Sequence, residues 1–236
     1  MRKSGYRFEA GFATWMMLIA FSMLSINGKG QVAIIVNPTA LRAAPNEDSE
    51  VLDKLEVGFA IYIYDWDAEE YEDWHIVEYD NDTLSRARVD TSVKTTTYKG
   101  YISKEDLWYI DDLMTPDQVN LLEYTSDFDS SGHAIVSIMK NWTDYSYLDE
   151  PHWGTDGTLP RSQVDSITLV YFGNRSLIPT HLSSDIYETH HDEYSTAYYP
   201  PYYIFTKPCS DGAGGYDLTW VFREDELVQR LLVVPF

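Results

Sequence analysis

Cysteine is almost absent from this chain: Cys209 is the single one, so no disulfide can form within it. An exported chain without disulfides must be stabilised by its hydrophobic core or by bound metal. The 236 residues are 44% hydrophobic and 15% aromatic, which is enough for one or two domains with real cores. This composition excludes an intrachain disulfide framework and a disordered chain.

Basic residues are also scarce, because 17 Lys and Arg stand against 38 Asp and Glu, for a net charge of −21. A surface of this sign repels nucleic acid and anionic membranes, so we expect neither as a partner. It suits a basic protein partner or divalent cations, and a merely solvated acidic surface is the simpler alternative.

Long apolar runs are confined to residues 12–26, which follow the basic Arg2, Lys3 and Arg7. A membrane-spanning helix needs roughly 20 apolar residues, and this run is shorter. The layout predicts that residues 1–31 are a cleaved signal peptide, with a retained membrane anchor as the alternative. We therefore expect a periplasmic or secreted protein with no stable membrane insertion after signal removal. Cleavage would leave a net charge of −24.

Short apolar and aromatic segments alternate with polar turns between residues 32 and 110, which is typical of a small β-barrel. The stretch 80–96 is polar and predicts a long loop or a ragged hairpin. Gly100 lies inside a strand-like segment, where glycine marks a bulge or a close backbone approach. The expected strands are 32–36, 59–66, 74–79, 98–103 and 104–110.

Four short motifs in this region resemble a bacterial SH3-like domain. They are Leu41-Arg42 with Pro45, a Leu-x-x-Gly turn at 55–58, a Trp-x-x-Val at 74–77, and Gly-Tyr-Ile at 100–102. In such a unit Leu41 fills the core, Arg42 projects from the bend, and Pro45 stiffens the loop. The resemblance implies an SH3-like barrel over residues 32–112 that engages a peptide, either peptidoglycan stem peptide or a protein.

The remainder, residues 113–236, predicts a second, mostly antiparallel β domain with a short helix. Thr115 as N-cap with Pro116 next is a helix start. The fold class is therefore mainly β, with two domains after the signal peptide. The segment SDGAGGYDLTWVF, residues 210–222, resembles the closing hairpin of uncharacterised secreted proteins that also carry a bacterial SH3-like unit, which implies no activity. The expected strands are 133–142, 166–173, 202–207, 216–223 and 227–236, the last two forming a hairpin.

The sequence contains only weak candidates for a catalytic site. Bacterial SH3-like domains often precede papain-like peptidases, which need a thiolate at a helix N-terminus and a His downstream. No His follows Cys209, which lies between a proline and a glycine-rich turn. We therefore predict an incidental thiol, no catalytic residue and no enzyme.

Metal sites are also weak. His190 and His191 are adjacent, so their side chains point apart on a strand, and His181 could join them only through folding. Asp127, Asp129 and Ser131 match the start of a calcium loop. The twelfth position should carry a bidentate Glu and is Ile138. Solvated polar turns are the preferred interpretation and no cofactor is expected, with calcium left open.

Loop aromatics line the peptide groove of SH3-like barrels, and this resemblance supplies the candidate site. We expect Trp74 and Tyr101 in the core. Residues 194–203 form a second aromatic cluster, either a binding surface or a loop held down by its own rings. The predicted ligand-binding residues are Arg42, Tyr64, Trp66, Tyr71 and Trp108.

Three functional hypotheses follow. The first is an exported, non-catalytic binding protein whose SH3-like unit engages a peptide. The alternative is an acidic inhibitor or immunity-type protein that neutralises a basic partner, because the negative charge would steer such a partner. The third is a cell-wall hydrolase that uses Cys209 or a metal near the histidines.

Overall fold

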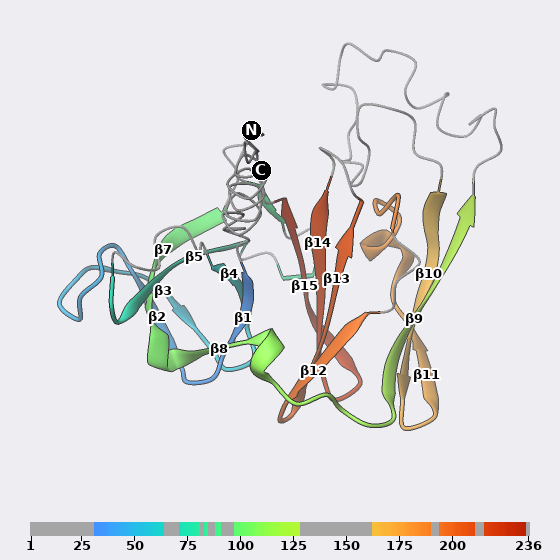
Figure 1. Ribbon diagram of the computed structural model, residues 1–236, viewed down its shortest axis with the longest axis horizontal. Helices are drawn as coiled ribbons and strands as arrows, with labels where there is room; N and C mark the ends of the chain where they lie inside the picture. Colours follow the sequence, from blue (N-terminus) through green and yellow to red (C-terminus); the bar gives the residue numbers. More distant parts are fainter. Residues whose placement is uncertain are drawn as a thin grey trace, which may run out of the picture.

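The protein is built from three stacked β-sheets (Figure 1). The computed structural model describes residues 31–63, 71–80, 83–84, 88–90, 97–127, 162–189, 194–210 and 215–234. Strands dominate these residues, and nearly all their pairings are antiparallel. The mainly β fold class with a mostly antiparallel second half is therefore confirmed.

The first sheet has the strand order β3-β2-β7-β5-β4-β1-β8. The five strands expected between residues 32 and 110 are present, and β4 and β5 pair antiparallel. Two further strands, β2 and β3, form around the Leu41-Arg42 motif. The bounds are β1 (Gln31–Ile35), β2 (Thr39–Arg42), β3 (Val51–Leu55), β4 (Ala60–Ile63), β5 (Trp74–Asp80), β7 (Thr97–Ser103) and β8 (Leu107–Tyr109).

The central sheet has the order β12-β13-β14-β15-β6, and the third sheet has the order β11-β10-β9. The expected closing hairpin is confirmed as β14 and β15. The bounds are β6 (Arg88–Asp90), β9 (Val119–Asp127), β10 (Ser162–Tyr171), β11 (Asn174–Leu177), β12 (Ser195–Tyr199), β13 (Tyr202–Cys209), β14 (Tyr216–Arg223) and β15 (Glu226–Val234). Three-residue 3₁₀ turns follow β7, β8 and the β11 region: η2 (Lys104–Asp106), η3 (Ile110–Asp112) and η5 (Thr180–Leu182).

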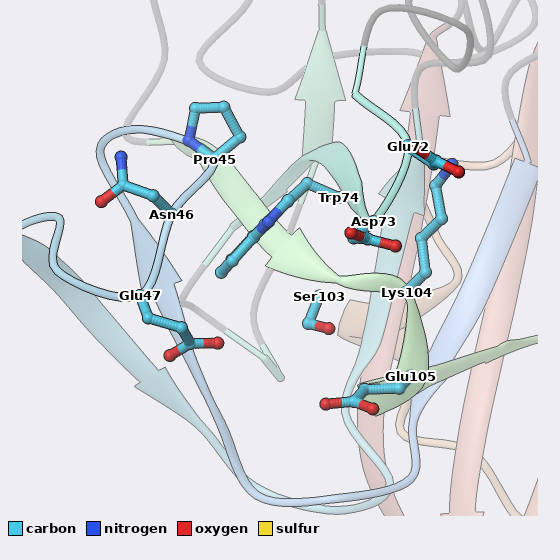
Figure 2. A pocket seen from close by; sticks show the side chains of 9 residues that line it. All are labelled: Pro45, Asn46, Glu47, Glu72, Asp73, Trp74, Ser103, Lys104 and Glu105. Carbon is cyan, nitrogen blue, oxygen red and sulfur yellow. The ribbon is translucent and has the colours of Figure 1, made fainter.

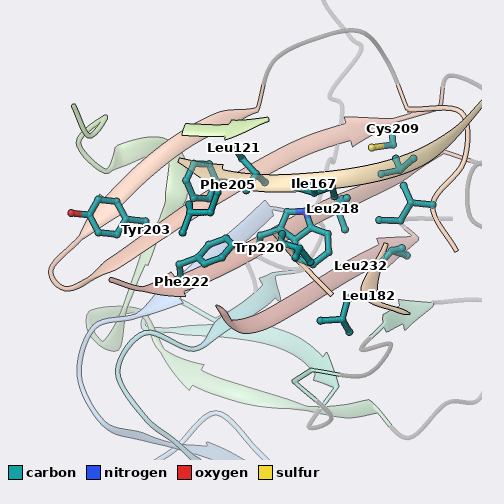
Figure 3. Close-up of a cluster of buried hydrophobic side chains, with 14 of the residues drawn as sticks. Leu121, Ile167, Leu182, Tyr203, Phe205, Cys209, Leu218, Trp220, Phe222 and Leu232 are labelled. Carbon is teal, nitrogen blue, oxygen red and sulfur yellow. The ribbon is translucent and has the colours of Figure 1, made fainter. Parts of the chain in front are cut away.

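The central sheet is buried on both faces. Successive strand residues point to opposite faces, so Trp220 and Phe222 enter the cluster shared with the third sheet, whereas Val221 enters the cluster shared with the first. Figure 3 shows the former cluster, with Ile167 of the third sheet opposite Trp220. This two-sided burial explains the unbroken apolar runs of β13, β14 and β15.

The expected closed barrel is wrong, because the first sheet is open. In the described residues no ladder joins its edge strands, β3 and β8. The sheet curls around an inner cluster that includes Leu41, Ile61 and Ile102. Its outer face at β1 and β4 packs against the central sheet instead of facing water. The outer face of the first sheet is therefore buried by the central sheet, and the first sheet does not need to close into a barrel.

The expected helix at Thr115 is also wrong. Residues 119–127 form β9, which pairs with β10 along its whole length. Val119 and Leu121 alternate inward into the core shared with the central sheet. The free energy gained by burying this face of the strand outweighs the local preference for a helix, since helix propensity is weak compared with packing.

Two glycines of the SH3-like motifs are required by close approaches. A Cβ on Gly100 would lie 2.6 Å from the backbone oxygen of Arg42, which confirms the expected close backbone contact. Gly58 has a φ of +89°, and a Cβ there would lie 2.2 Å from the ring of Tyr202. Gly58 therefore supplies a left-handed turn and also lets the central sheet approach the first.

The N-terminal and C-terminal halves of the chain are joined by a strand pairing and by a side-chain contact. Residues 88–90, from the polar stretch after β5, form β6, which pairs in parallel with the end of β15. In the other direction, the buried Gln229 of β15 reaches the backbone of β4. Its Oε1 accepts from the Ala60 amide at 2.7 Å, and its Nε2 donates to the Ala60 carbonyl at 2.9 Å. The side chain thus replaces a neighbouring strand.

We predict that Gln229→Leu lowers the free energy of unfolding by about 2–4 kcal/mol. The substitution keeps the volume but leaves a buried amide and a buried carbonyl without partners, at roughly 1–3 kcal/mol each. Urea denaturation measures the change, with the exposed Glu226→Leu of the same strand as control. A loss no larger than that of the control would contradict the role of Gln229.

Candidate functional site

A hollow of about 530 Å³ opens on the first sheet, and we call it the Trp74 groove (Figure 2). Its walls come from three separate segments: the loop between β2 and β3, the turn before β5, and the junction of β7 with η2. Figure 2 shows these side chains arranged around Trp74. The lining residues are Pro45, Asn46, Glu47, Glu72, Asp73, Trp74, Ser103, Lys104 and Glu105.

Arg42 holds the β2–β3 loop in shape. Its Nη1 donates to the Ser49 carbonyl at 3.0 Å, and its Nη2 donates to Glu47 Oε2 at 3.0 Å. The Ser49 hydroxyl in turn accepts from the Ala44 amide at 2.8 Å. Arg42 therefore bonds to the same loop that contributes Glu47 to the groove.

Trp74 is the aromatic centre of the groove and is half-buried. As the first residue of β5 it pairs with Ser103 of β7. Backbone bonds hold both flanks: the Trp74 amide donates to the Tyr71 carbonyl at 3.3 Å, and the Lys104 amide donates to the Asp73 carbonyl at 3.0 Å. The indole is therefore held by a strand pair rather than by a free loop.

The groove is strongly acidic. Among the described residues, four carboxylates and one basic side chain, Lys104, line it. Within the described part of the chain, the carboxylates of Glu72, Asp73 and Glu105 make no hydrogen bond or ion pair. The excess of carboxylates over this one cation raises the local attraction for a cationic ligand.

The predicted ligand-binding residues do not all lie at the groove. Tyr71 is half-buried with its ring 5.2 Å from that of Tyr101, next to the groove. Trp108 is 53% exposed and contacts the ring of Tyr199, outside the groove lining. Tyr64 and Trp66 lie outside the described residues. Trp74, which sequence reasoning assigned to the core, is the aromatic residue that lines the hollow.

The residues that the sequence suggested as weak metal ligands are not brought together in the described part of the structure. Asp129, Ser131, His190 and His191 lie outside the described residues, and the backbone of Asp127 ends β9. Over the described ranges, no three His, Cys, Asp or Glu side chains are grouped so as to hold a metal ion. None of the helical turns in those ranges has the length and apolar character to cross a membrane.

The aromatic segment 194–203 is held down by its own side chains. Tyr203 and Tyr198 pack together with ring centroids 4.6 Å apart. The Tyr199 hydroxyl donates to the Val36 carbonyl of the first sheet at 3.2 Å, and Tyr202 packs over Gly58. The rings therefore join the sheets, which is the second of the two alternatives left open by the sequence.

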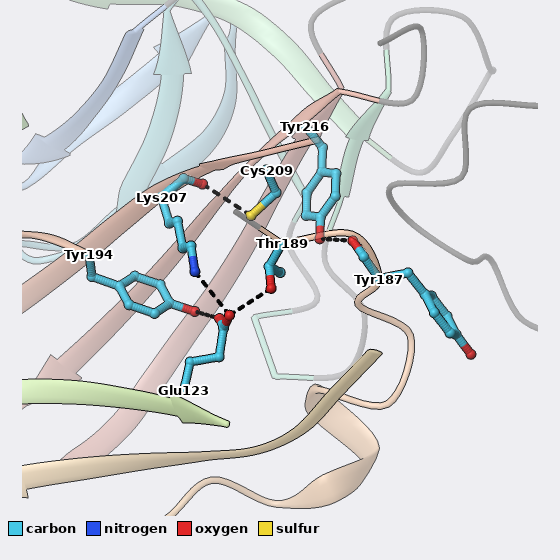
Figure 4. Close-up of polar contacts among 7 residues, drawn as sticks. All are labelled: Glu123, Tyr187, Thr189, Tyr194, Lys207, Cys209 and Tyr216. Carbon is cyan, nitrogen blue, oxygen red and sulfur yellow. Dashed lines mark hydrogen bonds and ion pairs between the residues drawn. The ribbon is translucent and has the colours of Figure 1, made fainter. Parts of the chain in front are cut away.

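A buried polar cluster links the third sheet to the central one (Figure 4). Glu123 of β9 accepts from Lys207 Nζ at 2.9 Å and from the Thr189 hydroxyl at 2.7 Å, both at Oε1. Its Oε2 accepts from the Tyr194 hydroxyl at 2.7 Å. The Lys207 and Glu123 side chains are 3% and 7% exposed. Burial, followed by the charge of Glu123, raises the pKa of Tyr194 well above its usual value.

A second buried ion pair joins the central sheet to the segment that follows η5. Arg230 of β15 donates from Nη2 to both oxygens of Asp185 at 3.0 Å. These pairs are fully enclosed, so they fix which strands face one another more than they add net stability. Sequence reasoning missed them because their partners lie 84 and 45 residues apart.

Cys209 lies at the edge of the polar cluster and is buried. Its thiol donates to the Lys207 carbonyl at 3.6 Å. Burial is the main cause that raises its pKa to about 12. The thiolate that a nucleophilic cysteine needs is therefore disfavoured at neutral pH.

Comparisons of this chain with protein-family models, with curated proteins and with solved structures find no match. The SH3-like resemblance stays a prediction that rests on the motifs and on the positions that the structure gives them.

We predict that Cys209 resists thiol reagents in the folded protein. At pH 8 a thiol with a pKa near 12 is almost wholly protonated, and burial denies access to the reagent. Labelling with a chromogenic disulfide measures the rate, and the same protein in concentrated urea is the positive control. Native labelling as fast as that of the unfolded chain would contradict the buried position.

Proposed function

We propose that this chain is an exported, non-catalytic binding protein and that the Trp74 groove receives a peptide segment of its partner. One observation carries the proposal: a half-buried tryptophan lies in a hollow of about 530 Å³ walled by three segments of the first sheet and its loops. Aromatic side chains in concave sites are the commonest anchors of peptide recognition.

The groove suits a peptide more than a compact small molecule. It is open and mostly polar along its rim, where Asn46 and Ser103 offer groups that hydrogen-bond to a peptide backbone. It also lies at the Leu41-Arg42 loop and the Trp-x-x-Val strand, which are two of the motifs on which the resemblance rests. SH3-like domains bind extended peptides over such aromatic surfaces.

A binding role is also supported by the poor fit of the described residues to catalysis. Among the described lining residues there is no His or Cys that could act as base or nucleophile. Cys209 is buried in another part of the molecule with a raised pKa. Export rests on the N-terminal sequence pattern of residues 1–31, which lies outside the described residues.

The acidic-inhibitor hypothesis remains the second candidate, and the carboxylates of the groove favour it. An immunity-type protein would use the same surface to neutralise a basic partner. The two candidates share a peptide-sized contact at Trp74 and differ in whether the partner loses an activity when bound.

We predict that Trp74→Ala weakens peptide binding about 30-fold, because loss of a central aromatic anchor costs about 2 kcal/mol or more. Peptides are first selected from a displayed random library on residues 32–236. Their Kd values are then measured by calorimetry for the parent and the variants.

Trp108→Ala is the matched control, because it removes the same side chain from an exposed site outside the groove. It should leave the Kd within about twofold, a change worth under 0.5 kcal/mol. Urea midpoints confirm that both variants fold. Undiminished binding by Trp74→Ala, or loss confined to Trp108→Ala, would contradict the assignment of the groove.

A further inference from the structure

We infer that the side chain received by the Trp74 groove is an arginine of the partner, with its guanidinium over the indole and its N–H groups on the surrounding carboxylates. This inference rests on the proposed function and names the ligand chemistry of the same site. It identifies the partner as a basic protein or peptide rather than a peptidoglycan stem peptide.

The first step is the sign of the charge. Glu72, Asp73 and Glu105 make no ion pair within the described part of the chain, and they line one hollow. Lys104 is the one basic side chain among the described lining residues, so negative charge remains in excess there, and an incoming cation reduces the repulsion among the carboxylates. A ligand that ends in carboxylates, as a stem peptide does, would increase the repulsion among negative charges in the groove. Charge complementarity therefore selects a cationic side chain.

The second step separates a side-chain cation from a metal ion. The carboxylates of the groove are spread over three segments, and no three of the described acidic side chains are grouped for metal coordination. A divalent ion needs several oxygens at about 2.0–2.6 Å around one point. A long organic cation can instead contact carboxylates that lie on different walls.

The third step separates guanidinium from ammonium. An ammonium is a compact, strongly hydrated point charge, whereas a guanidinium is flat, weakly hydrated and carries five N–H donors in a plane. The groove offers an aromatic residue between acidic walls, which suits stacking by the flat group and bonding at its edges. Figure 2 shows Trp74 between Glu47 on one side and Asp73 on the other.

The Arg42–Glu47 pair supports this choice. Glu47 Oε2 already accepts from the Arg42 guanidinium at 3.0 Å. Within the described residues, Oε1 of Glu47 makes no hydrogen bond. It is available to a second guanidinium that enters from the groove. The chain's own arginine thus fixes the acceptor that the partner's arginine would use.

The test compares five-residue probes, acetyl-Ala-Ala-X-Ala-Ala-amide, in which X is arginine, citrulline, lysine or glutamate. Citrulline has nearly the shape of arginine and no charge. Titrations followed by calorimetry are run on the parent protein, on Trp74→Ala, and at low and high salt. We expect the arginine probe to bind at least about tenfold more tightly than the citrulline probe, in line with a charge-assisted pair.

Carboxylate variants localise the effect. Glu72→Gln combined with Glu105→Gln should reduce the preference for arginine over citrulline severalfold and leave citrulline binding unchanged. The matched control is Glu226→Gln with Glu56→Gln, two exposed glutamates outside the groove lining. It removes the same charge from the molecule and should keep the preference.

The outcomes separate this inference from the proposed function. Equal binding of arginine and citrulline, abolished by Trp74→Ala, would keep the peptide groove and overturn the arginine assignment. Lysine binding as tightly as arginine would overturn the guanidinium choice. If no probe binds while library-selected peptides still need Trp74, the arginine assignment alone is overturned. If no peptide of either kind depends on Trp74, the proposed function is overturned with it.

Discussion

The structure depends on one constraint, which is that the central sheet must be covered on both faces. Along β14, Leu218, Trp220 and Phe222 require a covering layer on one side, and Val221 requires one on the other. The third sheet supplies the first cover, and the outer face of the first sheet supplies the second (Figure 1). Neither face of the β13–β15 run could remain in water without exposing a large apolar area.

This constraint also explains the shape of the first sheet. Its strands β1 and β4 are buried on both faces, because Ile34 and Tyr62 face the central sheet while Ile35 and Ile61 face the inner cluster. A sheet pressed against a neighbour in this way does not need to close on itself. Gln229 completes the join by satisfying the backbone of Ala60 beyond the end of the β4–β5 pairing, which covers Tyr62 and Ile63.

The packing of the first sheet on the central sheet also supports the Trp74 groove. It lies at β2, β5 and β7, and Figure 1 shows β2 and β3 on the side of the first sheet that faces away from the central sheet. The packed β1 and β4 strands anchor the sheet, and Arg42 and Gly100 fix the loop against β7. Trp74 and its acidic neighbours are thereby presented on a firm surface. A site of this kind binds without having to order itself first.

Local sequence signals predicted a good part of this fold and less of the site. Alternation and apolar runs located β1, β4, β5, β7 and the closing hairpin, because side-chain period is a local property. The same signals failed at Thr115, where pairing with β10 outweighed a helix start. They also placed Trp74 in the core, since period does not tell a groove from an interior.

Long-range features could not be read from the sequence at all. The two buried ion pairs join residues far apart in the chain, and nothing near Glu123 or Asp185 marks its partner. The parallel pairing of β6 with β15 depends on a polar stretch that has no strand pattern. Such contacts follow from which faces are covered, which is a property of the assembled sheets.

The most direct test of this account is native-state hydrogen exchange of the backbone amides of β4 and β15. If the two sheets are halves of one core, the amides of Ile61–Ile63 and Leu231–Val233 should exchange with the same opening free energy, equal to that of global unfolding. Release of β4 at a clearly lower free energy, while β15 stays protected, would show that the groove-bearing sheet opens by itself. That result would contradict the shared core.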